Sequence, residues 1–334
     1  MLTLPILTDF AVRGTIAMFG FGDGGQIIIP PDALTPSPPS SIPLLGFGTW
    51  NLKISEENTT AAVSAALQAG YKHIDCAAIY GNEKEVGEGI KHGLEVTGQR
   101  REDIWVTSKL WNDHHGADQV SEALMKTLSD LGLDYLDLYL MHWPVASSGG
   151  KNEIDYLETW HAMSAIPSFK ARHVGVSNFD PKQMKDIIAK SSVKPAVHQF
   201  ELHPYLQQNE WVQWHKDNGI NVTAYSPLAN LNPIYGGKTS PPSLLKNVVI
   251  SEIAKTRGCT NAQVALAWGI GRGTSVIPKS SHVKRIQENL DSKNCNLEKE
   301  DYEIMEDLGR KYTKRFNNPS DGWGVPLYEG LEGT

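Results

Sequence analysis

Residues 131–144 read LGLDYLDLYLMHWP and contain a helix end, a β-type run and a polar residue where that run ends. Gly132 stands where a helix should stop, because glycine readily adopts the left-handed conformation that closes a helix. The run 136–143 that follows predicts a β-strand that ends near His142. Upstream, apolar residues recur at the helical spacing i, i+4, i+8 and i+11, at Val120, Leu124, Leu128 and Leu131.

The same alternation of helix and strand continues along the chain from residue 42, and Gly70 marks another helix end before a strand. Short β-type runs occur at 42–50, 72–77, 103–110, 136–143, 172–179, 196–203, 221–228 and 274–280. Strands that alternate with helices form a parallel sheet, and eight of them close a barrel. We therefore predict an α/β fold, a single-domain (β/α)₈ TIM barrel over residues 42–334 that includes a C-terminal tail lining the substrate site.

Polar residues favour this barrel over its alternative, a doubly wound open sheet. Several of them lie at or near the carboxyl ends of predicted strands, namely Asp75, Lys109, His142, Ser177, Gln199 and Lys279. Barrels build their sites on that face from residues of many strands. A site at the carboxyl face of the barrel is therefore expected.

Residues 1–41 differ from the rest of the chain. The segment 30–40, PPDALTPSPPS, contains five prolines, which exclude a helix or a central strand. The segment 20–25, GFGDGG, fits the dinucleotide-binding pattern G-x-G-x-x-G, but no helix pattern follows it to hold a pyrophosphate. We interpret residues 1–41 as an N-terminal extension with a possible β-hairpin and a proline-rich linker.

The composition indicates an ordinary globular protein. The formal net charge of −7 argues against a nucleic-acid partner, and no window reaches the length of apolar sequence that a membrane span needs. The three cysteines, Cys76, Cys259 and Cys295, form no C-x-x-C pair and no disulfide framework, which suits a reducing cytosol. We expect a cytoplasmic protein without a nucleic-acid or membrane partner.

Four segments resemble signature segments of the aldo-keto reductases, in the order of that family. They read GYKHIDCAAIYGNEKEVGEGI (70–90), LGLDYLDLYLMHWP (131–144), GVSNF (175–179) and VIPKSSHVKRIQENL (276–290). The resemblance runs from about residue 42 to the C-terminus and implies NADP(H)-dependent reduction of carbonyl groups. It also implies a monomer or a weak dimer, since monomers are common in that family. It places the family's catalytic group on Asp75, Tyr80, Lys109 and His142.

These four residue types suit the reduction of a carbonyl. Hydride arriving at the carbonyl carbon leaves an alkoxide, so the oxygen needs a proton donor. A phenol has an ordinary pKa near ~10 and is a weak acid unless its phenolate is stabilised. A lysine beside Tyr80 would stabilise the phenolate, an aspartate would keep that lysine charged, and His142 would hydrogen-bond the carbonyl oxygen. Each residue alone has an ordinary structural explanation, but four together on successive strand ends favour catalysis.

The resemblance also implies a cofactor site, with the 2′-phosphate of NADP(H) bound by Lys279 and Arg285. A guanidinium and an ammonium suit a dianionic phosphate, so we expect NADP(H), with use of both cofactors as the alternative. Tyr225 would stack on the nicotinamide ring. The full set of expected cofactor contacts is Gly48, Thr49, Trp50, Asp75, Ser177, Asn178, Gln199, Tyr225, Ser226, Leu228, Lys279, Ser280, Arg285, Glu288 and Asn289.

Aromatic residues dominate the expected substrate contacts, which are Trp50, Tyr80, His142, Trp143 and Trp323. Aromatic walls with few charges suit small aldehydes and open-chain sugars. No metal-ligand pattern is present in the sequence, and the chemistry requires no metal.

Two departures from the common family pattern bear on the substrate. The segment 166–172, IPSFKAR, is similar to one in fungal NADP-dependent glycerol dehydrogenases and glyceraldehyde reductases, and the connection after Pro144 is short. We therefore expect reduction of glyceraldehyde-like aldehydes, reversible toward polyols such as glycerol, in an open substrate mouth. Xylose or other aldose reductase activity is the alternative. A regulatory subunit that binds NADPH with little turnover is an alternative of another class.

Overall fold

The computed structural model describes residues 42–52, 56–146, 154–229, 231 and 241–331. The hairpin expected within residues 1–41, and most of the short connection after Pro144, lie outside these residues. Each of the eight predicted runs overlaps a strand, and β5 begins one residue before its run. The strands are β1 (Phe47–Gly48), β2 (His73–Asp75), β3 (Trp105–Leu110), β4 (Leu136–Met141), β5 (Ala171–Ser177), β6 (Val197–Glu201), β7 (Asn221–Tyr225) and β8 (Ser275–Val276).

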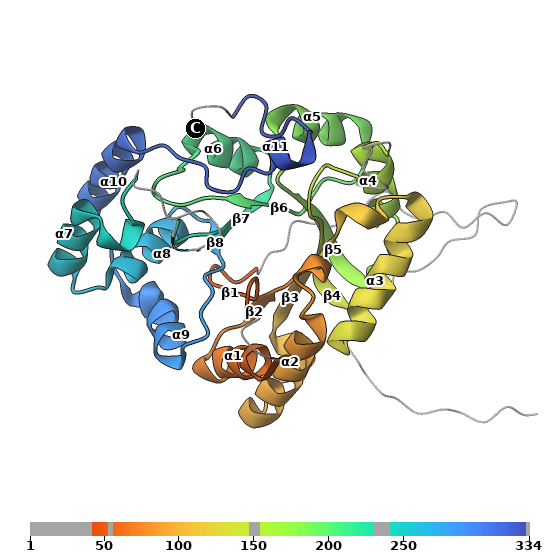
Figure 1. The fold of residues 1–334 in the computed structure, drawn as a ribbon, viewed down its shortest axis with the longest axis horizontal. Helices are drawn as coiled ribbons and strands as arrows, with labels where there is room; N and C mark the ends of the chain where they lie inside the picture. The colour runs from red at the N-terminus through yellow and green to blue at the C-terminus, as the bar shows by residue number, and fades with distance from the viewer. Residues whose placement is uncertain (1–41, 53–55, 147–153, 230, 232–240, 332–334) are drawn as a thin grey trace, which may run out of the picture. The chain divides into compact units, whose positions relative to one another are not determined.

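The strands form one parallel sheet in the order β1 to β8, and the last strand returns to the first. Val276 N donates to Leu44 O at 2.9 Å and Gly46 N donates to Val276 O at 2.9 Å, which joins the two edges. Gly48 allows this closure, because a Cβ atom there would lie 2.9 Å from Ile277 O. Figure 1 shows the ring of strands surrounded by helices. The predicted (β/α)₈ barrel is confirmed.

Helices cover the outside of the ring. Their bounds are α1 (Glu56–Ala69), α2 (Glu83–Thr97), α3 (Ala117–Leu131), α4 (Tyr156–Ser164), α5 (Pro181–Lys190), α6 (Asn209–Asp217), α7 (Val248–Arg257), α8 (Asn261–Gly271), α9 (Val283–Leu290), α10 (Lys299–Lys311) and α11 (Ser320–Trp323). The apolar face predicted for α3 is buried, and Gly132 closes that helix with φ +63°. No helix in the described part of the chain is long and apolar enough to cross a membrane.

The expectation of no disulfide is wrong. Cys259 and Cys295 form one, with their Cα atoms 5.9 Å apart, a separation usual for a disulfide. Cys259 follows α7, and Cys295 follows the short 3₁₀ turn Asp291–Asn294 after α9. The two residues are 36 positions apart, and only the packing of the 3₁₀ turn against α8 brings them together. Cys76 is a free, buried thiol.

A series of hydrogen bonds between uncharged groups joins two buried histidines, His198 of β6 and His215 of α6. Phe179 N donates to His198 Nε2 at 3.1 Å, so the proton of His198 is on Nδ1, which lies 2.7 Å from His215 Nε2. His215 Nδ1 is then the protonated nitrogen and lies 2.7 Å from Trp211 O. A further proton would place two donors face to face. Burial lowers the pKa of His215 to about 4 and that of His198 well below its usual value.

Buried histidines make the stability of the protein sensitive to acid. Burial also lowers the pKa of His73 and His115 to about 4. The unfolded chain binds protons on these rings below pH ~6.5 while the folded chain does not, so unfolding is favoured as the pH falls. We predict that the free energy of unfolding decreases between pH 6.5 and about 4, by roughly 2–3 kcal/mol for each such histidine.

Urea denaturation at several pH values in this window measures the effect. His215→Gln should give a shallower dependence on pH, whereas His161→Gln, at an exposed position of α4, should leave the slope unchanged. A free energy of unfolding that stays constant from pH 6.5 to 4.5 would contradict the prediction.

Candidate active site

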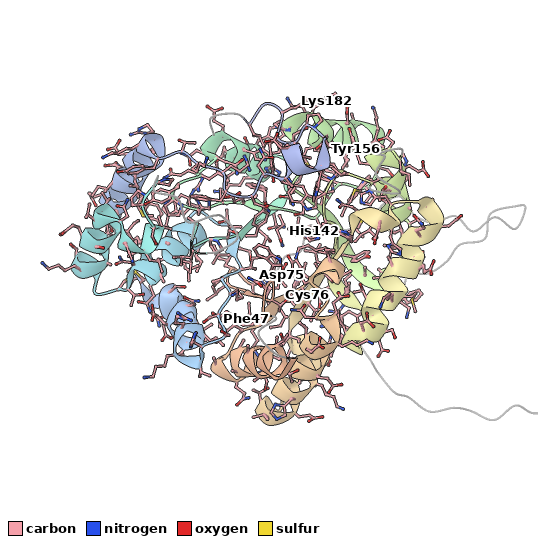
Figure 2. The ribbon with its side chains drawn as sticks, viewed as in Figure 1. Phe47, Asp75, Cys76, His142, Tyr156 and Lys182 are labelled. Atoms are coloured by element: carbon pink, nitrogen blue, oxygen red, sulfur yellow. A yellow bond between two sulfur atoms is a disulfide. The ribbon has the colours of Figure 1, made fainter. Side chains whose placement is uncertain are left out.

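The polar residues singled out in the sequence meet at the carboxyl face of the barrel. Asp75 ends β2, Lys109 lies one residue before the end of β3, and His142 follows β4 directly. Tyr80 lies in the 3₁₀ turn Ala78–Tyr80 after β2. In Figure 2, Asp75 and His142 lie near the centre of the ring of strands, whereas Tyr156 lies among the outer helices.

Lys109 is the centre of this group. Its side chain is fully buried, and its Nζ lies 2.5 Å from Asp75 Oδ1, 2.8 Å from Cys76 O and 3.4 Å from Tyr80 Oη. An ammonium has three protons, and these three acceptors take all of them. Gln199 Nε2 donates to the other carboxylate oxygen, Asp75 Oδ2, at 2.8 Å. Burial alone would lower the pKa of Lys109, but Asp75 and Tyr80 outweigh it and raise that pKa, so the lysine is charged.

The hydroxyl of Tyr80 accepts from Lys109, which leaves its own proton for another acceptor. No described residue takes that proton. Burial raises the pKa of Tyr80 more than the charge of Lys109 lowers it, so the pKa is raised to about 12. The lysine therefore acts in the expected direction, but burial prevails, and the phenol is protonated at neutral pH.

His142 faces Tyr80 across the mouth of the barrel, with ring centroids 5.9 Å apart. Burial, together with the charge of Lys109, lowers the pKa of His142 well below its usual value. The ring is therefore neutral and carries one N–H. Trp111 and Trp143 flank it, with centroids 5.1 and 6.5 Å from the histidine ring.

A second group of polar residues lies at the carboxyl ends of β5 and β7. Asn178 Nδ2 donates to His142 O at 3.0 Å, and Tyr225 Oη donates to Asn178 Oδ1 at 2.7 Å. Asn178 and Ser226, which directly follow the two strands, have φ values of +63° and +49°. Non-glycine residues rarely adopt this conformation and cluster at functional sites when they do.

Two cations stand at the β8–α9 end of the site. Burial and the charge of Arg285 lower the pKa of Lys279. Neither side chain forms an ion pair with a carboxylate of the described residues. Arg285 Nε lies 3.4 Å from Ser280 Oγ, and Glu288 accepts from Thr260 Oγ1 at 2.7 Å. Two cations that repel each other and have no acidic partner in the described part of the chain suit a bound anion.

A cavity of about 610 Å³ connects the two ends. Every expected catalytic, cofactor and substrate residue lines it except Lys109, Ser177 and Gln199, which are buried. Sequence reasoning missed Trp111, which directly follows β3 and could have been found as a residue at the carboxyl end of a strand. It also missed Ile79 and Leu231, for which the sequence holds no comparable signal. Asn317 and Pro319 were not singled out, but they belong to the C-terminal tail that was expected to line the substrate site.

Comparison with known proteins agrees with this architecture. The model of the Aldo/keto reductase family matches residues 44–310. An uncharacterised oxidoreductase of Schizosaccharomyces pombe is 48% identical, over 88% of this chain and 92% of the relative. Aldo-keto reductase family 1 member A1 of Bos taurus is 41% identical, over 86% of this chain and 93% of the relative.

Solved structures show the same fold. An aldo-keto reductase of Bombyx mori, solved in complex with NADP, has a TM-score of 0.80 and 32% identity, over 94% of this chain and 99% of that one. The aldose reductase of Giardia lamblia has a TM-score of 0.77 and 35% identity, over 85% and 97%. The chain therefore belongs to the aldo/keto reductase family and is an oxidoreductase.

Proposed function

We propose that this protein reduces uncharged aldehydes, from glyceraldehyde to aromatic aldehydes, with Tyr80 as the proton donor. The reverse reaction would oxidise polyols such as glycerol. One observation carries the proposal: the hydrogen-bonded series Asp75–Lys109–Tyr80 ends at a cavity beside the neutral ring of His142. This arrangement favours turnover over a purely regulatory role.

The cofactor is NADP(H), the group bound in the solved Bombyx mori relative. The residues present fit it. Lys279 and Arg285 offer two cations without acidic partners in the described ranges, and Ser280 offers a hydroxyl between them in sequence. These residues would hold the 2′-phosphate. Asn178 and Tyr225 would border the nicotinamide at the other end of the cavity.

Bound NADPH supplies the hydride, and the side chains of this protein supply the proton and the orientation. Tyr80 retains its proton at neutral pH, because its pKa is raised to about 12, and can deliver it to the carbonyl oxygen. Lys109 donates to the oxygen that becomes a phenolate and stabilises its charge, and Asp75 holds the lysine in place. The N–H of neutral His142 can direct the carbonyl oxygen toward Tyr80.

The residues that line the cavity favour an uncharged substrate. Trp50, Trp111, Trp143 and Trp323 line it together with Ile79. Its charged residues in the described ranges are Asp75, which Lys109 and Gln199 bind, and three residues of the segment 279–289. The cations among these residues are Lys279 and Arg285, which would hold the 2′-phosphate of the cofactor. No described cation of the cavity wall therefore remains to bind a carboxylate on the substrate. The second candidate, an aldose reductase acting on xylose, is supported by the likeness to the aldose reductase of Giardia lamblia.

A panel of aldehydes tests the proposed substrate class. Oxidation of NADPH, followed by absorbance, should proceed with glyceraldehyde and with an aromatic aldehyde. It should be slower with galacturonate, because a carboxylate would be desolvated against tryptophan rings without a cation. Highest activity with xylose would favour the second candidate. Absence of turnover with every aldehyde would contradict the proposal and favour a regulatory subunit.

Tyr80→Phe tests the proton donor. The phenylalanine keeps the ring but removes the proton, so kcat should fall at least about 100-fold, while NADPH affinity stays near that of the wild type. Tyr156→Phe is the matched control, because that hydroxyl is bonded to Asp186 among the outer helices. Retention of more than about a tenth of wild-type turnover, against the 10²–10⁴-fold usual for a general acid, would transfer the role to His142.

Arg285→Ala tests the phosphate site. Loss of one charge-assisted contact should weaken NADPH binding roughly 10- to 100-fold, with little change for NADH. The control is Lys284→Ala, which removes a neighbouring exposed cation that does not line the cavity. Quenching of tryptophan fluorescence on titration measures both affinities. Equal losses for NADPH and NADH would assign Arg285 a structural role instead.

A further inference from the structure

The wall of the cavity includes a segment without regular structure. Residues 313–319, between α10 and α11, form no helix or strand, yet Asn317 and Pro319 line the cavity and the segment leads to Trp323. In Figure 1 this dark blue C-terminal part of the chain runs from α10 to α11 past β7 and β6. Backbone N–H groups of such a segment need partners outside it.

Glu201, the last residue of β6, supplies two of these partners. Its side chain is fully buried, Oε1 accepts from Phe316 N at 2.8 Å, and Oε2 accepts from Asn317 N at 2.8 Å. His203 Nε2 lies 2.8 Å from Oε1 on the same side chain. Burial would raise the pKa of Glu201, but the hydrogen bonds from His203 and from the tail outweigh it and lower that pKa. The carboxylate is therefore charged, the form that accepts both N–H groups.

Hydrogen bonds continue from this anchor to the residues that border the reaction centre. Asn317 Nδ2 donates to Tyr225 Oη at 3.1 Å, and Tyr225 donates to Asn178 Oδ1 at 2.7 Å. The hydroxyl of Tyr328 lies 3.0 Å from Asn317 O and 3.3 Å from Asn178 Oδ1, so its single proton can bridge to either. Asn178 in turn donates to the backbone oxygen of His142.

The same segment places Trp323 over the outer part of the cavity. Its ring centroid lies 5.0 Å from that of Trp143 and 6.1 Å from that of Trp111, and Trp111 lies 5.1 Å from His142. Trp323 is therefore one ring further from His142 than these two tryptophans. A three-carbon aldehyde held at Tyr80 and His142 does not extend that far, whereas a substituted aromatic aldehyde does.

We propose that Glu201 is a positioning residue that determines the substrate range, because its carboxylate fixes the segment 316–317 and thereby the outer wall formed by Trp323. The proposal rests on the proposed reduction of aldehydes. In this proposal, the reaction centre and the outer wall have different roles. Tyr80 and His142 act on every aldehyde, and the anchored tail acts only on those long enough to reach it.

Glu201→Gln tests the anchor with the full-length protein. The amide keeps the size of the side chain, but its NH₂ faces the backbone N–H of either Phe316 or Asn317, since each carboxylate oxygen accepts from one of them, so one tail contact is lost. We expect kcat/KM for 4-nitrobenzaldehyde to fall roughly 10- to 100-fold, the usual effect of losing a charge-assisted hydrogen bond, through a higher KM. The value for glyceraldehyde should stay within about threefold, since that substrate does not reach the tail.

Asp137→Asn is the matched control. Asp137 is also a buried carboxylate that accepts a backbone N–H, from Val106 at 2.9 Å, but it lies near the amino end of β4. This variant should leave the ratio of the two kcat/KM values unchanged even if it loses stability. Tyr328→Phe, which removes one bridge from tail to Asn178, should shift the ratio in the same direction as Glu201→Gln but less, and it carries the test if the glutamine variant does not fold.

The outcomes separate the two proposals. If the wild type reduces neither aldehyde, the proposed function fails. If it reduces both, and Glu201→Gln and Tyr328→Phe lower both activities in equal proportion or lower neither, the glutamate has no part in substrate choice and the inference is wrong.

Discussion

The ion pair between Lys109 and Asp75 is the interaction on which the site depends. The ammonium is fully buried, and the carboxylate is only 2% exposed. A buried pair is maintained only if every partner is present, because removal of one leaves an isolated charge at a cost of about 3–5 kcal/mol. The pair of the exposed Lys182 and the partly exposed Asp186 on α5 has a smaller consequence, since water reaches both partners.

The topology of the barrel explains how this pair forms. β2 and β3 are parallel neighbours, with Asp75 opposite Thr107, so both side chains reach the interior from the carboxyl ends of adjacent strands. A strand period of two and the known order of strands are sufficient to bring Asp75, Lys109 and His142 together. For this reason their meeting could be predicted from the sequence: each lies near the carboxyl end of a β-type run, and a closed parallel barrel brings the ends of all such runs to one face.

Other contacts could not be predicted in this way, because they depend on chain segments without periodicity. Asn317 and Tyr328 reach Asn178 from a tail that carries no strand or heptad pattern. The disulfide of Cys259 was missed for a similar reason, since the proximity of Cys295 follows from packing between α8 and the turn after α9. The direction of the pKa shift of Tyr80 could not be predicted either. The neighbouring Lys109 lowers that pKa, as the sequence indicated, but burial raises it more, and the extent of burial depends on the whole fold.

Two parts of the site are therefore held in place in different ways. Lys109 lies in β3, His142 directly follows β4 and Tyr80 lies in the 3₁₀ turn that closely follows β2, so their geometry follows from the barrel itself. The segment 313–319 that leads to the outer wall belongs to no sheet or helix, so it needs a separate constraint, and the charged side chain of Glu201 supplies it from the end of β6. The anchor lies at the end of a strand, and the irregular segment that it binds leads to α11, which contains Trp323. Changes in residues 318–327 can alter which aldehydes fit without removing the anchor, because the tail groups that Glu201 binds are the backbone N–H groups of Phe316 and Asn317.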